Sequence, residues 1–156
     1  RFGKKFSPAH SLEKILITYL RRVKFIFTPN NNSMKFTVDK KERYCIFKLD
    51  EPKLDSIISA NLKSELVILN QEGFRNIICD LSDVNFIDSS GLSALLIGHR
   101  LCKESNGTFV LTGCGDSTVK LIKISQLDTI LNVVPTESEA TDFILMEEIE
   151  REIGEE

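Results

Sequence analysis

The chain has 156 residues, of which 42% are hydrophobic and 28% are charged, as is typical of a single globular domain with room for a core. It contains only two histidines, His10 and His99, which excludes a His-rich metal site. Residues 34–156 carry 13 basic and 22 acidic residues, a net charge of −9, which makes this part of the protein a poor binder of nucleic acid.

Residues 1–33 differ from the rest in charge, with seven basic residues and one acid, a net charge of +6. Their apolar stretch, SLEKILITYLRRVKFIF, is interrupted by Arg21, Arg22 and Lys24 and falls short of the ~20 apolar residues that a membrane span needs. A small-residue cleavage site does not follow it, which argues against a secretory signal. A surface-lying amphipathic helix is one interpretation. We favour a cytoplasmic protein without stable membrane insertion, whose domain starts at Met34 and whose residues 1–33 are an extension or a start-site error.

Beyond the basic segment, strand and helix patterns alternate. Residues 34–39, MKFTVD, place apolar and polar side chains on opposite faces, and residues 44–49, YCIFKL, predict the second strand of a hairpin. Asp55 or Ser56 then caps a helix that ends before Gly73. The apolar stripe of this helix consists of Ile58, Leu62, Leu66 and Leu69.

The middle of the chain predicts a buried strand and a second helix. The continuous apolar run NIICDL is typical of a strand that is buried on both faces. After a polar break at Ser82 and Asp83, VNFID leads into a helix that begins at two serines and stops at Asn106 and Gly107. The stripe of this helix consists of Leu92, Leu95, Leu96, His99 and Cys102.

The remaining predicted elements are shorter. TFVLTG is a strand, DSTVKLIKI is a short helix capped by Asp116 or Ser117, and LNVVP is a short strand. Thr136 and Glu139 form a capping box that opens a last helix with an acidic tail. The side chains predicted to lie inside this helix are Ala140, Phe143 and Ile144. The order β-β-α-β-α-β-α-β-α predicts an α/β fold, with a mixed, mostly parallel sheet of four to five strands and about four helices.

Two serines occupy the point where the middle strand gives way to the second helix. Ser89 is predicted at the N-cap, where its oxygen would accept a hydrogen bond from the backbone N–H of Gly91 or Leu92. In open α/β sheets, functional groups gather at the carboxyl ends of the strands. A cap needs only one hydroxyl, so a purely structural cap and a functional site both remain open at this stage.

Catalytic chemistry is poorly supported by the residues. G-x-S-x-G is absent, and His99 lies about 15 Å along the same helix from Ser89, too far to act as its base. The lone G-x-G of TGCGDS favours a tight turn over a nucleotide site. The four cysteines lack C-x-x-C spacing and three lie in apolar runs, which favours reduced and mostly buried thiols over disulfides or a metal site.

The stretch IICDLSDVNFIDSSGLSALL resembles the signature segment of the STAS domain, the fold of bacterial anti-sigma factor antagonists. In that family, a strand of the form apolar-x-x-D-L-x-x-V-x-F-x-D leads into S-S-G-L at a helix N-terminus. The resemblance extends over about residues 34–146, includes KLDSIISANLKSEL as the first helix, and leaves residues 1–33 unmatched. There are two departures from the family. The first is DEPK before Leu54, where the family often has Gly-Glu or Gly-Asp, and the second is the acidic tail after Met146, which lengthens the last helix beyond a minimal STAS domain and has no assigned role.

The resemblance implies a regulator that catalyses nothing and uses no cofactor or metal ion. Ser89 would be the phosphoacceptor of a cognate serine kinase that doubles as an anti-sigma factor. The unphosphorylated protein would bind this kinase and release the sigma factor, and a PP2C-type phosphatase would reset the phosphorylated protein. The residues expected to contact the kinase are Asp55, Asp88, Ser89, Ser90, Gly91 and Leu92.

Two other classes of function stay open. A STAS subunit that only docks on a larger assembly, such as a stressosome or a lipid-transport complex, would not need a hydroxyl at this position. A small-molecule or nucleotide-binding module would need a pocket. If the protein is instead the phosphorylation-switched regulator, Asp88 would orient the loop or repel a misplaced phosphate, and Gly91 would let a kinase approach the serine closely.

Overall fold

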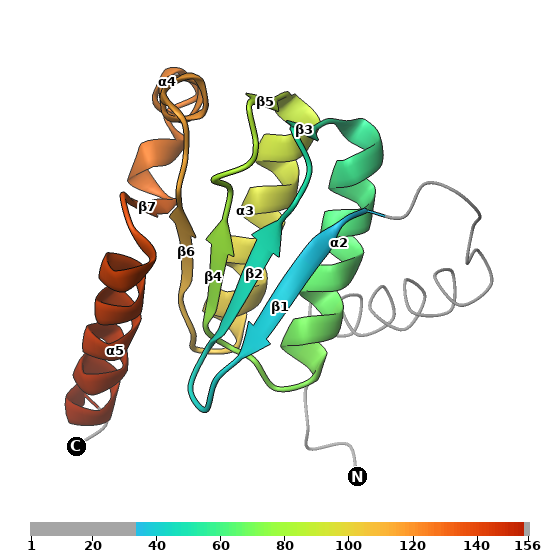
Figure 1. The fold of residues 1–156 in the computed structure, drawn as a ribbon. Coiled ribbons are helices and arrows are strands. Elements are labelled where there is room, and N and C mark those ends of the chain that lie inside the picture. The colour runs from blue at the N-terminus through green and yellow to red at the C-terminus, as the bar shows by residue number, and fades with distance from the viewer. Residues whose placement is uncertain (1–33, 155–156) are drawn as a thin grey trace, which may run out of the picture. The chain divides into compact units, whose positions relative to one another are not determined.

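Five strands form the central sheet of the computed structural model, which describes residues 34–154 (Figure 1). In spatial order the strands are β1 (Phe36–Lys40), β2 (Cys45–Leu49), β4 (Ile77–Asp80), β6 (Phe109–Thr112) and β7 (Asn132–Val134). The first pair is antiparallel, as the predicted hairpin requires, and the other three pairs are parallel. The mixed, mostly parallel sheet is therefore confirmed. The interpretations of residues 1–33 lie outside the described residues.

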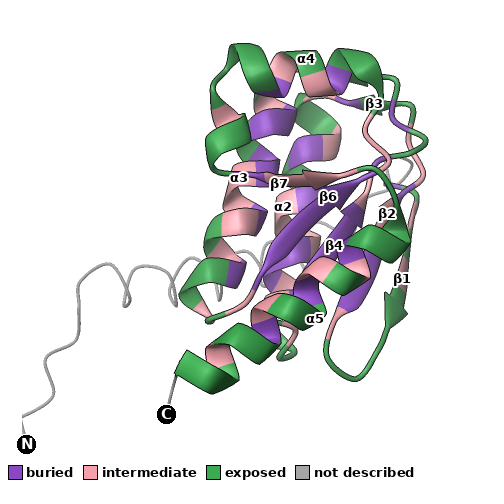
Figure 2. Cartoon of the chain, turned by 90° about the vertical axis from the view of Figure 1, so that its left-hand side faces the viewer, coloured by how far each residue is buried: buried purple, intermediate pink, exposed green. Residues whose placement is uncertain are grey.

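Helices cover both faces of this sheet (Figures 1 and 2). The elements are α2 (Ser56–Gln71), α3 (Ser89–Glu104), α4 (Asp116–Ile124), the 3₁₀ helix η1 (Leu127–Thr129) and α5 (Glu137–Gly154). Helices α2 and α3 pack side by side on one face, and α5 lies on the other. Of the helices within residues 34–154, none combines the length and the apolar character needed to cross a bilayer.

The two faces of β4 explain its continuous apolar sequence. Ile77 and Cys79 point into the larger core beneath α2 and α3, and Ile78 points into a smaller cluster under α5. In the smaller cluster, Ala140 and Ile144 of α5 are fully buried. The strand therefore lacks a polar face because a helix covers each side of it.

Helix ends were predicted with mixed success. Gly73 follows α2 with a φ of +106°, and the N–H of Phe74 donates to the carbonyl of Leu69 at 3.1 Å, so the predicted stop is confirmed. The side chain of Thr136 accepts from the N–H of Glu139 at 3.2 Å, as a capping box requires. The predicted cap of α4 is wrong, because Gly115 occupies the N-cap and Asp116 is already helical.

Two short strands were not predicted. β3 (Lys53–Leu54) and β5 (Phe86–Ile87) pair in parallel as a separate two-stranded sheet. Each is two residues long, so neither is long enough to produce a period-two pattern. Their pairing holds the segments that precede α2 and α3 side by side.

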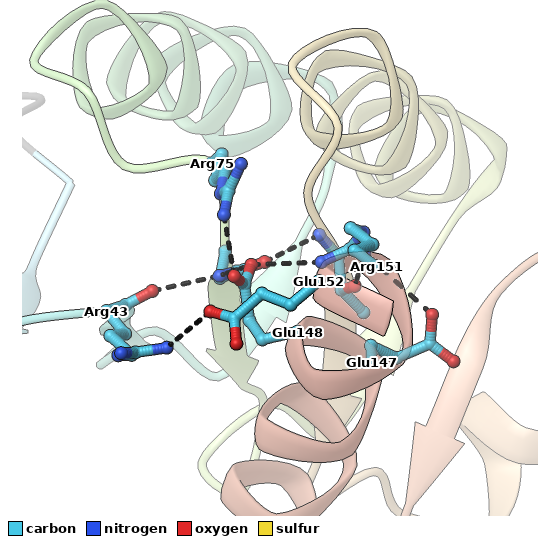
Figure 3. A network of polar contacts seen from close by, with 8 residues as sticks. Arg43, Arg75, Glu147, Glu148, Arg151 and Glu152 are labelled. Atoms are coloured by element: carbon cyan, nitrogen blue, oxygen red, sulfur yellow. Dashed lines mark hydrogen bonds and ion pairs between the residues drawn. The ribbon is translucent and has the colours of Figure 1, made fainter. Parts of the chain in front are cut away.

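A buried carboxylate fixes the last helix to the amino ends of the strands (Figure 3). Glu148 is 3% exposed and accepts hydrogen bonds from Asn76 Nδ2 at 2.7 Å, from Arg75 at 2.6 Å and from Arg151 at 3.0 Å. Asn76 Oδ1 accepts from the N–H of Thr108 at 2.9 Å, and Arg151 donates to the Thr108 hydroxyl. The acidic tail left unexplained by the sequence therefore begins with a structural contact, at the end of the sheet opposite the two serines.

Candidate functional site

The candidate site is built by the pairing of β3 with β5. Leu54 lies opposite Ile87 in this pair, so the residues that follow them, Asp55 and Asp88, begin α2 and α3 next to one another. The N–H of Asp88 also donates to the carbonyl of Leu54 at 3.3 Å. Two predicted contact residues from distant parts of the sequence are thus brought together at one end of the fold.

Asp88, and not Ser89, is the N-cap of α3, so the predicted cap was wrong by one residue. Asp88 has an extended backbone (φ −108°, ψ −174°), and its carboxylate accepts from the N–H of Gly91 at 3.0 Å. The cause is the β3–β5 pairing, which keeps Asp88 in strand geometry and places the helix start at Ser89. Asp88 therefore fills the capping role that was predicted for Ser89, and this gives its carboxylate a structural role.

Ser89 is consequently free of any capping duty. It is the first helical residue and is exposed, and within residues 34–154 its hydroxyl has no hydrogen-bond partner. Ser90 is only partly exposed. The arrangement presents the Ser89 oxygen to solvent at a helix N-terminus, where the backbone N–H groups and the helix dipole favour added negative charge.

Gly91 and Leu92 lie beneath the surface. A β-carbon on Gly91 would lie 2.6 Å from Ile87 Cγ1 and 2.7 Å from the carbonyl oxygen of Leu54, so the glycine is needed for α3 to pack against the β3–β5 pair. Leu92 is 6% exposed and belongs to the main core. The fold itself thus requires a glycine at this position, and the expected role of Gly91 in access by a kinase stays a prediction.

Exposed apolar side chains border the site, and sequence reasoning missed them. Phe86 of β5 is 52% exposed and Ile57 in the first turn of α2 is 56% exposed. Asp55 accepts hydrogen bonds from the N–H groups of Ile57 and Ile58, both at 3.1 Å, and so caps α2 as predicted. The available signal was Phe86 itself, an aromatic residue in the VNFID segment, to which no separate strand was assigned.

Other reactive groups are poorly placed for chemistry. Among residues 34–154, no three His, Cys, Asp or Glu side chains are grouped to hold a metal ion. The four cysteines are free, and Cys114 is the least buried of them. Burial, with a smaller contribution from the charge of Asp80, raises the pKa of Cys114 to about 11, so the thiol is protonated at neutral pH. Burial also lowers the pKa of His99.

Much of the described sequence is similar to known proteins. The profile of the STAS domain family matches residues 35–140. An anti-sigma-B factor antagonist of Bacillus subtilis is 27% identical over 81 residues, which cover 52% of this chain and 73% of the relative.

Solved structures share the fold. An anti-sigma factor antagonist from Mycobacterium paratuberculosis has a TM-score of 0.64 at 22% identity, covering 74% of this chain and 97% of the other. The anti-sigma factor antagonist SpoIIAA in its unphosphorylated form has a TM-score of 0.61 at 21% identity, covering 70% and 96%. The phosphorylated form of SpoIIAA from Bacillus has a TM-score of 0.56 at 22% identity, covering 70% and 99%.

Proposed function

The chain belongs to the STAS domain family, and on that premise we propose that it is an anti-sigma factor antagonist switched by phosphorylation of Ser89. The partner is an anti-sigma factor with serine kinase activity. The unphosphorylated protein binds this partner and frees the sigma factor, phosphorylation releases the partner, and a PP2C-type phosphatase restores binding. The protein contributes a surface and an acceptor hydroxyl, and the kinase supplies the chemistry.

The observation that carries this proposal is that, at the start of α3, Asp88 caps the helix while the next residue, Ser89, is exposed. Asp88 satisfies the backbone N–H of Gly91, and the neighbouring Ser89 hydroxyl is exposed without a described partner. A serine retained only as a cap would be engaged with the helix backbone. An exposed hydroxyl at the first helical position is accessible to a kinase and can be modified without removing a hydrogen bond from the fold.

The charge balance at this position explains why the fold would survive modification. A phosphoryl group adds about −1.5 to −2 charges at neutral pH. The N-terminus of α3 stabilises negative charge by about 0.3–1 kcal/mol at an exposed site. Repulsion by the Asp88 carboxylate opposes it, at about 1 kcal/mol for two unit charges 4 Å apart in water. Because the two effects nearly cancel, the free energy of unfolding changes little.

Partner binding responds differently, because the docking surface includes apolar groups. Phe86 and Ile57 are half exposed beside the two capped helix starts, and a partner that covers them also dehydrates Ser89. Burying a charged group without a partner costs several kcal/mol. The same phosphate that the isolated domain tolerates therefore disrupts the complex, and the modification works as a local release switch.

The test compares affinity and stability in the same variants. We expect Ser89→Asp to weaken binding to the anti-sigma kinase at least tenfold by calorimetry, while its melting temperature stays within about 2 °C of the unmodified protein. Ser89→Ala should bind normally and resist phosphorylation. The matched control is Ser138→Asp, which adds the same charge near the start of α5, on the opposite face of the sheet.

Three results would overturn parts of the proposal. If peptide mapping after incubation with kinase and ATP finds phosphate only on Ser90, the assigned acceptor is wrong. If Ser89→Asp unfolds the domain, the local-switch account fails. If Ser89→Asp binds as well as the unmodified protein, the docking surface lies elsewhere, and a subunit that docks constitutively on a larger assembly becomes the better description.

A further inference from the structure

The outer face of α5, defined here as Leu145, Met146, Ile149 and Ile153, is unusually apolar for a solvent-facing surface. These side chains are 38%, 63%, 54% and 66% exposed, respectively. They make up half of the large hydrophobic side chains that are exposed in residues 34–154. Their spacing of three and four residues places them in one stripe along the helix.

The orientation of this stripe is fixed by contacts on the opposite side of α5. Ala140, Ile144 and Glu148, spaced four residues apart, are buried against the sheet. Glu148 and Arg151 fasten the last turns through their hydrogen bonds to Asn76, Arg75 and Thr108. The outer face therefore cannot turn inward, and within residues 34–154 its apolar groups are left in contact with water.

The charges around the stripe select the kind of molecule that fits. Helix α5 has seven acidic residues and one arginine, a net charge of −6. At 100° per residue, Glu139 and Glu150 flank the outer face on one side and Glu152 flanks it on the other. A second copy of α5 would bring like charges together, whereas a helix with lysines and arginines beside its apolar stripe would meet opposite ones.

We propose that the outer face of α5 is a docking surface for an amphipathic helix of a partner protein whose apolar stripe is flanked by Lys and Arg. The partner helix buries its stripe on Leu145, Met146, Ile149 and Ile153. Its basic residues pair with Glu139 and Glu150, whereas Glu152 already pairs with Arg43 at 3.3 Å. Because α5 and the start of α3 lie on opposite faces of the sheet, this partner can be bound irrespective of Ser89 phosphorylation.

The test uses a labelled Leu/Lys peptide of about 18 residues, five helical turns, with a Leu/Glu peptide of the same pattern for comparison. Fluorescence anisotropy with the full chain should show binding of the Lys peptide only, weakening as salt is raised. The double variant Ile149→Ser/Ile153→Ser should bind it at least tenfold more weakly. The matched control is Ile124→Ser/Ile130→Ser, at residues 78% and 46% exposed on other elements, which should bind normally. All these substitutions leave the net charge unchanged.

Several outcomes would overturn the proposal. Equal binding by the two double variants would mean that the peptide is held by charge alone. Equal binding of the Lys and Glu peptides would remove the argument from charge. If sedimentation shows that the full chain dimerises and that Ile149→Ser/Ile153→Ser abolishes the dimer, the occupant is a second copy. This docking proposal can fail or hold independently of the proposed function, since Ser89→Asp should leave binding of the Lys peptide unchanged.

Discussion

Replacing Glu148 by glutamine tests whether the buried carboxylate holds α5 on the sheet. Glutamine keeps the shape and one acceptor oxygen, so Asn76 can stay satisfied, but Arg75 loses its anionic partner and Arg151 keeps only Glu147, at 3.8 Å. Arg75 is 46% exposed in its side chain and can be rehydrated, whereas Arg151 is 23% exposed and cannot be fully. Hydrogen bonds to charged groups contribute about 1.5–3 kcal/mol each, and breaking a buried pair costs about 3–5 kcal/mol. With partial rehydration of Arg75, we expect a loss of about 3 kcal/mol.

Thermal and urea unfolding measure this loss. For a domain of this size, 3 kcal/mol corresponds to a fall in melting temperature of about 10 °C. The control is Glu150→Gln, two residues along on the exposed side of α5, which should change the free energy of unfolding by less than about 0.5 kcal/mol. A cost below about 1 kcal/mol for Glu148→Gln, or an equal cost for both variants, would refute the reasoning.

The pH dependence of the same variant provides a second check. Burial, the largest influence, raises the pKa of Glu148, but hydrogen bonds from Asn76 and Arg75 and the charges of Arg75 and Arg151 more than offset it, so the pKa is lowered overall. A lowered pKa in the folded state means that the stabilisation is fully present above the ordinary pKa of glutamate. It is lost as the pH falls through the folded pKa. The difference in stability between native protein and Glu148→Gln should therefore shrink on acidification and stay constant from pH 6 to 8.

Three further predictions concern the site and its surroundings. Gly91→Ala should destabilise the domain by about 1–3 kcal/mol, because its β-carbon would meet backbone and side chain below 3 Å, whereas Gly154→Ala, with open space around it, should stay within about 0.5 kcal/mol in urea unfolding. Asp88→Ala should cost about 1 kcal/mol through loss of the cap, and Ser89→Ala much less, by the same assay. Cys114, with its pKa raised to about 11, should react with iodoacetamide at pH 7 far more slowly than a free thiol, as followed by mass spectrometry; rapid labelling would contradict the burial.

The order of strands and helices was predictable because each longer element has its own hydrophobic period. The outward alternation of β1, the apolar run of β4 and the stripe of α3 each signal one element without knowledge of the rest. Asp55 was predictable for the same reason, since a cap is a local interaction. The cap of α3 was misplaced because β3–β5 pairing, a contact between segments more than 30 residues apart, decides where the helix begins.

The polar contacts that anchor α5 could not be predicted from the sequence, because they join residues that are far apart in it. Glu148 continues the four-residue spacing of Ala140 and Ile144, so its buried position could have been inferred from the stripe. Its partners could not, because Arg75 and Asn76 lie more than 70 residues away in the sequence and meet Glu148 only once α5 packs on the sheet. For lack of a visible counter-charge in the sequence, the acidic tail was given no role.

The two edge strands of the central sheet, β1 and β7, restrict how this protein can assemble. On β1, Asp39 and Lys40 are exposed and form ion pairs with Lys41 and Glu72, which leaves charge along an otherwise open row of backbone groups. At the other edge, β7 has only three residues and is followed at once by Pro135, which lacks an N–H donor. Short, charged or proline-terminated borders resist the addition of another strand. Strand addition at the edges of the central sheet is thereby disfavoured for the described residues, and concentrated solutions should resist the edge-to-edge stacking that leads to fibrils.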